Sequence, residues 1–164
     1  MANVILTLGD DVSTDVVYPG RYMATVLPSE TPLHAFADLP VNEALKAGRY
    51  PKGCVVVAGR NFGCGSSREQ AASCLRGHGL TVVARGFARI FLQNAVNVGL
   101  ELVTAPDVEA NEGDEIEVRA GVVVNVTTGR TFDVVPLPPQ RRAIVEAGGL
   151  VAYTRQRLAA LPPS

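Results

Sequence analysis

The feature that most constrains this sequence is a glycine-rich loop placed between an apolar run and a helix-forming segment. Residues 54–58 read C-V-V-V-A, a short β-branched run typical of a strand buried on both faces. Residues 59–65 contain three glycines, and residues 67–76 have helical composition. A strand, a glycine-rich turn and a helix form the repeating unit of α/β folds, which bind ligands at the carboxyl ends of their strands.

The alternation of strands and helices continues on both sides of this loop. Strands are predicted at residues 4–8, 80–84 and 101–103, and helices at residues 41–49 and 87–98. The order implies a parallel or mixed α/β core. An irregular, proline-containing stretch covers residues 22–40.

After Pro106 the pattern changes to short alternating or β-branched runs. Residues 115–118, 122–126 and 131–135 predict a β-meander packed beside the core, and helical segments follow at 138–147 and 150–158. With 164 residues and no long linker, the chain is expected to form one domain spanning residues 1–164.

The charge balance argues against nucleic acid as a partner. The net charge is -1 and no run of Lys or Arg is present. No stretch has the apolar length of a membrane span, and the first residues lack the pattern of a signal peptide. A soluble, cytoplasmic protein is therefore expected.

Three cysteines stand at positions 54, 64 and 74. Their spacing lacks the close pair that zinc and iron–sulfur sites take from one tight loop. Cys54 begins an apolar strand and Cys74 falls within a helical stretch, so both are interpreted as small buried side chains. No metal-binding or cofactor-binding residue is assigned to this chain.

The loop before the predicted helix has the properties of an anion site. Free backbone N–H groups at a helix start favour an anion, and Arg68 in the first turn adds a planar fork suited to a carboxylate. Ser66 with Glu69 fits a capping box, and Ser67 with Gln70 fits one shifted by a residue. One serine therefore caps the helix and the other faces the ligand, and the residues alone leave open which.

Other known loop chemistries do not fit. The G-x-x-x-x-G-K-[ST] and G-x-S-x-G patterns are absent from the loop. His34 is distant in sequence and His78 is expected in mid-helix, so neither supports a Ser-His dyad. Asp15, in a polar loop after the first strand, is either an ordinary turn residue or a group that orients a nearby Arg or Ser.

Three motifs in order resemble a known family. They are G-D-D-V-S-T-D with P-G-R-Y-M (residues 9–15 and 19–23), N-F-G-C-G-S-S-R-E-Q-A (61–71), and F-A-R-I-F with N-A-V-N-V-G-L (87–91 and 94–100). Together they resemble the small subunit of 3-isopropylmalate dehydratase, whose swivelling domain also occurs in aconitase and homoaconitase. The resemblance implies an α/β fold: a swivelling β/β/α domain with a mixed or parallel core sheet, flanking helices and an added β-meander.

The resemblance also implies a function. Such enzymes are hydro-lyases that interconvert 2-isopropylmalate and 3-isopropylmalate by dehydration and rehydration in leucine biosynthesis. They act only with a large subunit, which carries a [4Fe–4S] cluster, on a hydroxy-dicarboxylate substrate. Ser66 would be the general base, Asp15 would join the polar network of the catalytic site, and Ser67 and Arg68 would bind a substrate carboxylate.

Substrate choice is expected to depend on the segment Tyr22, Met23, Ala24 and Thr25. Homoaconitase-like members carry an Arg at the position of Ala24, where it pairs with an extra carboxylate. Ala24 leaves an apolar gap that favours the isopropyl group. A small subunit for 2,3-dimethylmalate or homoaconitate remains an alternative, as does a non-catalytic dicarboxylate-binding module.

Overall fold

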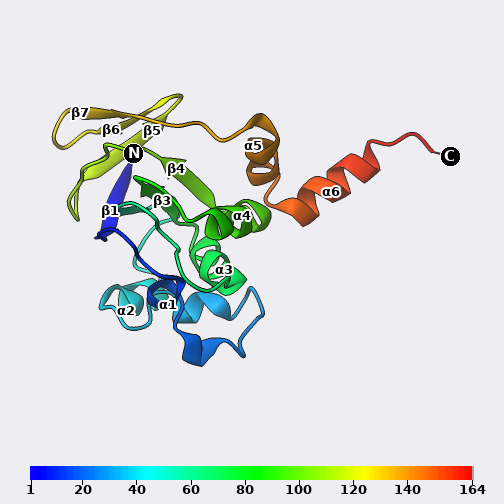
Figure 1. Ribbon diagram of the computed structural model, residues 1–164, viewed down its shortest axis with the longest axis horizontal. Coiled ribbons are helices and arrows are strands. Elements are labelled where there is room, and N and C mark those ends of the chain that lie inside the picture. Colours follow the sequence, from blue (N-terminus) through cyan, green and yellow to red (C-terminus); the bar gives the residue numbers. More distant parts are fainter. Residues whose placement is uncertain (164) are drawn as a thin grey trace.

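The computed structural model describes residues 1–163 and is built on one curled, seven-stranded sheet (Figure 1). The strand order is β4-β3-β2-β1-β5-β6-β7. The strands are β1 (Ala2–Thr7), β2 (Val55–Ala58), β3 (Thr81–Ala84), β4 (Glu101–Thr104), β5 (Glu115–Arg119), β6 (Val122–Asn125) and β7 (Arg130–Asp133). The helices are α1 (Thr14–Val17), α2 (Val41–Lys46), α3 (Glu69–Gly77), α4 (Arg89–Val98), α5 (Pro139–Glu146) and α6 (Leu150–Ala159), with 3₁₀ turns η1 (Gly20–Tyr22) and η2 (Thr31–His34).

Strands β1 to β4 form the parallel half of the sheet. In this half Val56 of β2 pairs with Val82 of β3, and Val82 pairs in turn with Leu102 of β4. All four residues of β2 are buried, as the continuous apolar run predicts for a strand covered on both faces. Because successive side chains point to opposite faces, this half of the sheet borders two separate cores.

The first core lies between the sheet and helices α1 to α4, which gather on one side of it in Figure 1. On this side α3 contributes Ala71, Ala72 and Leu75, and α4 contributes Phe91 and Ala95, all at most 1% exposed. Alanines carry little volume, so these helices can lie close to the strands. The tight packing fixes the positions of the β–α loops at the carboxyl edge of the sheet.

The second core lies on the opposite face and includes the meander. Ile116, Val123 and Phe132 of β5, β6 and β7 cluster with Val57 and Val83 of the parallel half. The sequence predicted a meander packed beside the α/β core. In the structure β5 instead pairs directly with β1, through Ala2–Ile116 and Asn3–Glu115, so that the meander extends the same sheet.

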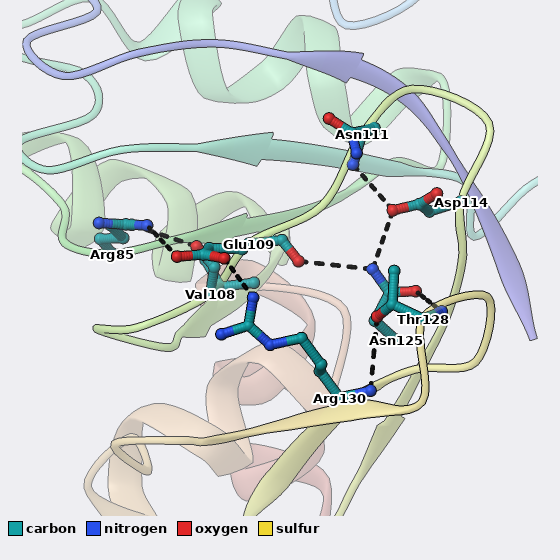
Figure 2. Close-up of polar contacts among 8 residues, drawn as sticks. All are labelled: Arg85, Val108, Glu109, Asn111, Asp114, Asn125, Thr128 and Arg130. Carbon is teal, nitrogen blue, oxygen red and sulfur yellow. Dashed lines mark hydrogen bonds and ion pairs between the residues drawn. The ribbon is translucent and has the colours of Figure 1, made fainter.

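A polar network fastens the segment before β5 to the meander (Figure 2). The Asp114 Oδ2 atom accepts hydrogen bonds from the Asn111 N–H and the Asn125 side-chain amide, both at 2.9 Å. The Asn111 N–H, followed by Asn125, lowers the pKa of Asp114 below its usual range. Glu109 forms an ion pair with Arg130 on β7. The buried side chains of Asp114 and Asn125 therefore satisfy each other, and their hydrogen bond favours one arrangement of the second core.

The C-terminal helices differ in how they meet the body. On α5, Arg142 forms a bidentate pair with Glu101 of β4, with both N–O distances at 2.8 Å. Helix α6 has no buried residue and extends away from the sheet in Figure 1. None of the helices in residues 1–163 combines the length and apolar character that crossing a membrane requires.

Candidate active site

Three loops that follow β1, β2 and β3 meet at the carboxyl edge of the parallel half. Isolated bridges join Ser13 to Cys64 and Phe62 to Phe87. The Gly63 N–H donates to the Val12 carbonyl at 2.7 Å, next to the first of these bridges. The three sequence motifs, which are far apart along the chain, therefore lie side by side at the edge where α/β folds bind ligands.

Gly63 of this loop lies directly against helix α4. Its φ is +85°, and a Cβ at this position would lie 2.2 Å from the Phe91 ring. Phe91 in turn packs edge-on against Phe62, with ring centroids 5.2 Å apart. A side chain at residue 63 is excluded by both conformation and space, so the glycine allows the loop to rest on the first turn of α4.

Two non-glycine residues of the site hold left-handed backbone conformations. Asp11 has a φ of 55° and Asn61 a φ of 58°. The Asn61 side-chain amide donates to Asp11 Oδ1 at 2.9 Å, which ties the first loop to the second. Asn and Asp tolerate this conformation better than other residues, but strain of this kind persists only where surrounding contacts enforce it.

The two serines have a different position from the one expected. Helix α3 begins at Glu69, and its N-cap is Arg68, with extended φ and ψ and no side-chain cap. Neither predicted capping box forms, and the placement of Arg68 in the first turn was wrong. Ser66 and Ser67 are both exposed, and within residues 1–163 neither hydroxyl has a hydrogen-bond partner. The loop bends here because Thr14 Oγ1 donates to the Ser66 carbonyl at 2.8 Å.

Arg68 is held by the first loop. Its Nη1 atom donates to Asp15 Oδ1 at 2.7 Å and to the Tyr18 carbonyl at 3.0 Å. Asp15 lies in α1, not in the predicted polar loop, and its Oδ1 also accepts the Gly20 N–H at 2.8 Å. The hydrogen bond from Arg68, then that from Gly20, lowers the pKa of Asp15. The start of α3 therefore carries a fixed guanidinium, preceded in sequence by two exposed serines, and these groups are of the kind that binds a carboxylate.

The segment Tyr22–Thr25 lies beside this cluster. It forms a turn closed by the Thr25 N–H and the Tyr22 carbonyl at 2.9 Å, and its Met23 carbonyl accepts from the Gln70 side chain at 3.3 Å. Met23 and Ala24 are exposed. The structure thus gathers all eight predicted site residues in one region, although their roles stay predictions.

The histidines serve the surroundings of the site. His34 stacks on the Tyr22 ring, with centroids 3.9 Å apart and an interplanar angle of 8°. His78 is the C-cap of α3 and not a mid-helix residue, and its Nε2 lies 2.8 Å from the Pro32 carbonyl. Sequence reasoning missed three further residues that shape the site, namely Thr14, Tyr18 and Gln70. Their contacts are to backbone carbonyl oxygens, and since every residue has a carbonyl, no sequence pattern predicts such contacts.

The cysteines divide between core and loop. Cys54 and Cys74 are buried, and burial raises the pKa of both thiols. Thiols held in the protonated form are poor ligands for a metal or cluster. Cys64 lies half-buried in the glycine-rich loop. Across residues 1–163, no three His, Cys, Asp or Glu side chains group closely enough to hold a metal ion.

The fold and the convergence of the three loops define a domain of the aconitase C-terminal type, and that family matches residues 31–107. The chain is 42% identical to the 3-isopropylmalate dehydratase small subunit of Moorella thermoacetica, over 93% of each chain. It is 46% identical to small subunit 1 from Methanopyrus kandleri, over 90% of this chain and 88% of that one. The chain belongs to the family of 3-isopropylmalate dehydratase small subunits.

A solved structure supports the same conclusion. The crystal structure of 3-isopropylmalate dehydratase from Methanocaldococcus jannaschii superposes with a TM-score of 0.86 and is 39% identical in sequence. The match covers 96% of this chain and 94% of that one. The swivelling α/β fold expected from the motifs is therefore confirmed over almost the whole chain.

Proposed function

We propose that this chain is the small subunit of a hydro-lyase that interconverts 2-isopropylmalate and 3-isopropylmalate in leucine biosynthesis. The observation that carries the proposal is the Arg68 guanidinium, fixed by Asp15 at 2.7 Å, in the residue that directly follows the exposed Ser66 and Ser67. The 42% identity to a 3-isopropylmalate dehydratase small subunit, over 93% of each chain, supports the same reaction. Residues 1–164 would act as one domain.

Removal of water from a hydroxy-dicarboxylate requires a base for the proton on the carbon next to a carboxylate. We assign this role to Ser66, whose oxygen would accept that proton as an alkoxide. A serine hydroxyl is normally far too weak an acid for this, so its anion needs strong stabilisation. The Arg68 charge and the free N–H groups at the start of α3 are the groups on this chain suited to provide it.

The substrate carboxylate would bind to Ser67 and Arg68. Arg68 is 16% exposed whereas Asp15 is 64% exposed, so the carboxylate of Asp15 faces solvent while the guanidinium is held beneath. Asp15 and the Tyr18 carbonyl both accept hydrogen bonds from Nη1 and keep the guanidinium in one orientation. Restricting a guanidinium in this way lowers the entropy lost when the substrate binds.

The other half of the site would come from a large subunit. When bound there, a [4Fe–4S] cluster supplies a Lewis acid for the substrate hydroxyl. The donors of this chain do not suit such a cluster. Cys54 precedes β2 and Cys74 lies in α3, both are buried, and burial raises the pKa of both thiols. Three free cysteines agree with the cytoplasm as the proposed compartment.

Ala24 supports an alkyl malate as the substrate. It lies exposed in the Tyr22–Thr25 turn, and a methyl side chain offers no partner to an additional carboxylate. The proposed assignment of the variable substituent to this turn therefore favours isopropyl over a carboxyalkyl group. 2,3-Dimethylmalate, with a shorter alkyl group, is the main competitor.

The decisive experiment is reconstitution with a cluster-bearing large subunit under anaerobic conditions. We expect no turnover by this chain alone and turnover of 3-isopropylmalate by the complex, with slower turnover of 2,3-dimethylmalate and homocitrate. Calorimetry of the isolated chain with the same acids provides the control. Tight dicarboxylate binding without any turnover in the complex would favour a non-catalytic binding module and reject the proposal.

A further inference from the structure

One buried side chain holds both ends of the Tyr22–Thr25 turn. Tyr18 directly follows α1 and is 0% exposed. Its hydroxyl lies 3.0 Å from the Tyr22 carbonyl and 3.2 Å from the Thr25 carbonyl, so one O–H is shared between the two. Burial raises the pKa of Tyr18, which keeps the phenol protonated and able to donate. The phenol therefore closes the turn from inside the protein.

The backbone of the same residue contacts Arg68. The Tyr18 carbonyl accepts a hydrogen bond from Arg68 Nη1 at 3.0 Å, next to the contact that Nη1 makes with Asp15. Tyr18 thus touches the guanidinium through its main chain and the turn through its side chain. A fully buried aromatic ring has little freedom to move, so the two contacts are held at a fixed separation.

Two neighbouring contacts strengthen this connection. Gln70, in the first turn of α3, donates from Nε2 to the Met23 carbonyl at 3.3 Å. The Tyr22 ring stacks on His34 and meets the Tyr18 ring edge-on, at centroid distances of 3.9 Å and 6.5 Å. The turn is therefore fixed at its backbone by Tyr18 and Gln70 and at its first side chain by His34.

We propose that Tyr18 is a positioning residue that sets the distance between Arg68 and the Tyr22–Thr25 turn, and thereby the size of the alkyl group the enzyme accepts. The inference rests on the proposed function of these two elements. The carboxylate and the alkyl group of a malate are joined by a short covalent frame. If Arg68 binds the carboxylate, a displaced turn no longer fits the alkyl group. Small displacements of this kind have large kinetic effects.

The first test is Tyr18→Phe in the reconstituted complex, which keeps the ring and removes the hydroxyl. We expect KM for 3-isopropylmalate to rise about tenfold with kcat nearly unchanged, the pattern of lost ground-state binding. Selectivity for 3-isopropylmalate over 2,3-dimethylmalate should fall by at least roughly threefold, because the smaller group depends less on the turn. Tyr153→Phe is the matched control. It removes a hydroxyl on α6 that accepts a hydrogen bond from Arg157 at 2.9 Å, and it should change neither value.

The second test uses amide hydrogen exchange on the isolated chain and does not depend on turnover. Tyr18→Phe should speed exchange at residues 22–27 and leave α4 unchanged. Gln70→Leu, which removes the contact to the Met23 carbonyl, should speed exchange at the same residues more weakly. If Tyr18→Phe does not fold, this variant tests whether these side-chain contacts hold the turn.

An active wild-type complex whose Tyr18→Phe variant keeps its selectivity and exchange pattern would overturn the inference. An inactive wild-type complex would instead count against the proposed function, while the exchange result would still judge whether Tyr18 holds the turn.

Discussion

Arg68 Nη1 and Asp15 Oδ1 lie 2.7 Å apart although 53 positions separate the two residues in sequence. The contact joins the loop after β1 to the loop after β2, and it joins the helix start at Glu69 to α1. The Arg68 side chain is 16% exposed, whereas the Asp15 side chain is 64% exposed and open to water. The pair thus gives the site an oriented positive group that a substrate carboxylate can approach.

Asp15→Asn should weaken this orientation without removing the cation. Because the Asp15 carboxylate is exposed, solvent screens the lost contact, and we expect kcat/KM in the complex to fall by roughly a few-fold. Asp38→Asn, which breaks the exposed pair with Arg21, is the control and should cost little. The measurement is steady-state kinetics of both variants. Equal losses in the two would show that Asp15 acts only through general surface charge.

Ser66→Ala and Ser67→Ala should separate the base from the carboxylate ligand. A lost general base lowers kcat by about 10²- to 10⁴-fold, so Ser66→Ala should fall in that range with KM little changed. Ser67→Ala should instead raise KM by about tenfold. Because both hydroxyls are exposed and unpartnered within residues 1–163, thermal stability should not change in either variant. Substantial turnover by the Ser66→Ala complex would remove that residue from its assigned role.

The buried strands and the helix after β3 could be predicted because they rest on local signals. The apolar run of β2 and the helical period of α4 are visible in single segments. The helix start was predicted wrongly because Ser66 and Glu69 match a capping pattern. Tertiary contacts override it: Thr14 holds the Ser66 carbonyl, and Asp15 draws Arg68 into an extended conformation.

Contacts between distant backbone groups could not be predicted at all. Ala2 pairs with Ile116, and this pairing places the meander in the main sheet. Nothing in the sequence near either residue predicts that the two are partners. The role of Tyr18 is hidden for a similar reason, since its hydroxyl binds two carbonyl oxygens and any residue supplies a carbonyl. Sequence motifs predicted the candidate site, and only the three-dimensional arrangement showed which contacts hold its residues in place.

Gly63→Ala should destabilise the chain strongly. The added methyl meets the Phe91 ring at 2.2 Å and the backbone keeps a φ of +85°, so overpacking and left-handed strain together cost about 2–5 kcal/mol. Gly121→Ala is the matched control, with a similar φ of +80° and open space around it, and should cost about 1–2 kcal/mol. Urea denaturation of both variants measures the difference. Similar losses would mean that the loop yields easily at residue 63.

Asp114→Asn should change how stability depends on pH. A carboxyl whose pKa is lowered in the folded state adds stability above its unfolded value, about 3.9, and loses it as the pH falls through the folded value. The variant should therefore melt below wild type at pH 7, and the gap should narrow below about pH 4. Asp133→Asn, an exposed position on β7, is the control. A gap that stays constant down to pH 3 would contradict the role assigned to Asp114 ionisation.

Ala24→Arg should shift substrate preference toward acids with an additional carboxylate. The position is exposed in the Tyr22–Thr25 turn, so a long side chain can enter without displacing the core. A charged hydrogen bond in the binding site contributes about 1.5–3 kcal/mol, which predicts a gain of roughly tenfold or more for homocitrate relative to 3-isopropylmalate. Ala24→Gln, of similar length but neutral, is the control. An unchanged ratio in the Arg variant would mean that another segment reads the substituent.

The position of β1 has a consequence for how the chain folds during its synthesis. β1 is synthesised before its two neighbours in the sheet. One of its edges pairs with β2, and the other pairs with β5, where Ala2 lies opposite Ile116. Unpaired strand edges invite association between chains. During synthesis the nascent chain therefore carries an open edge until most of it has emerged. Slow translation between β4 and β5 should make the product more dependent on chaperones, even when the finished protein is stable.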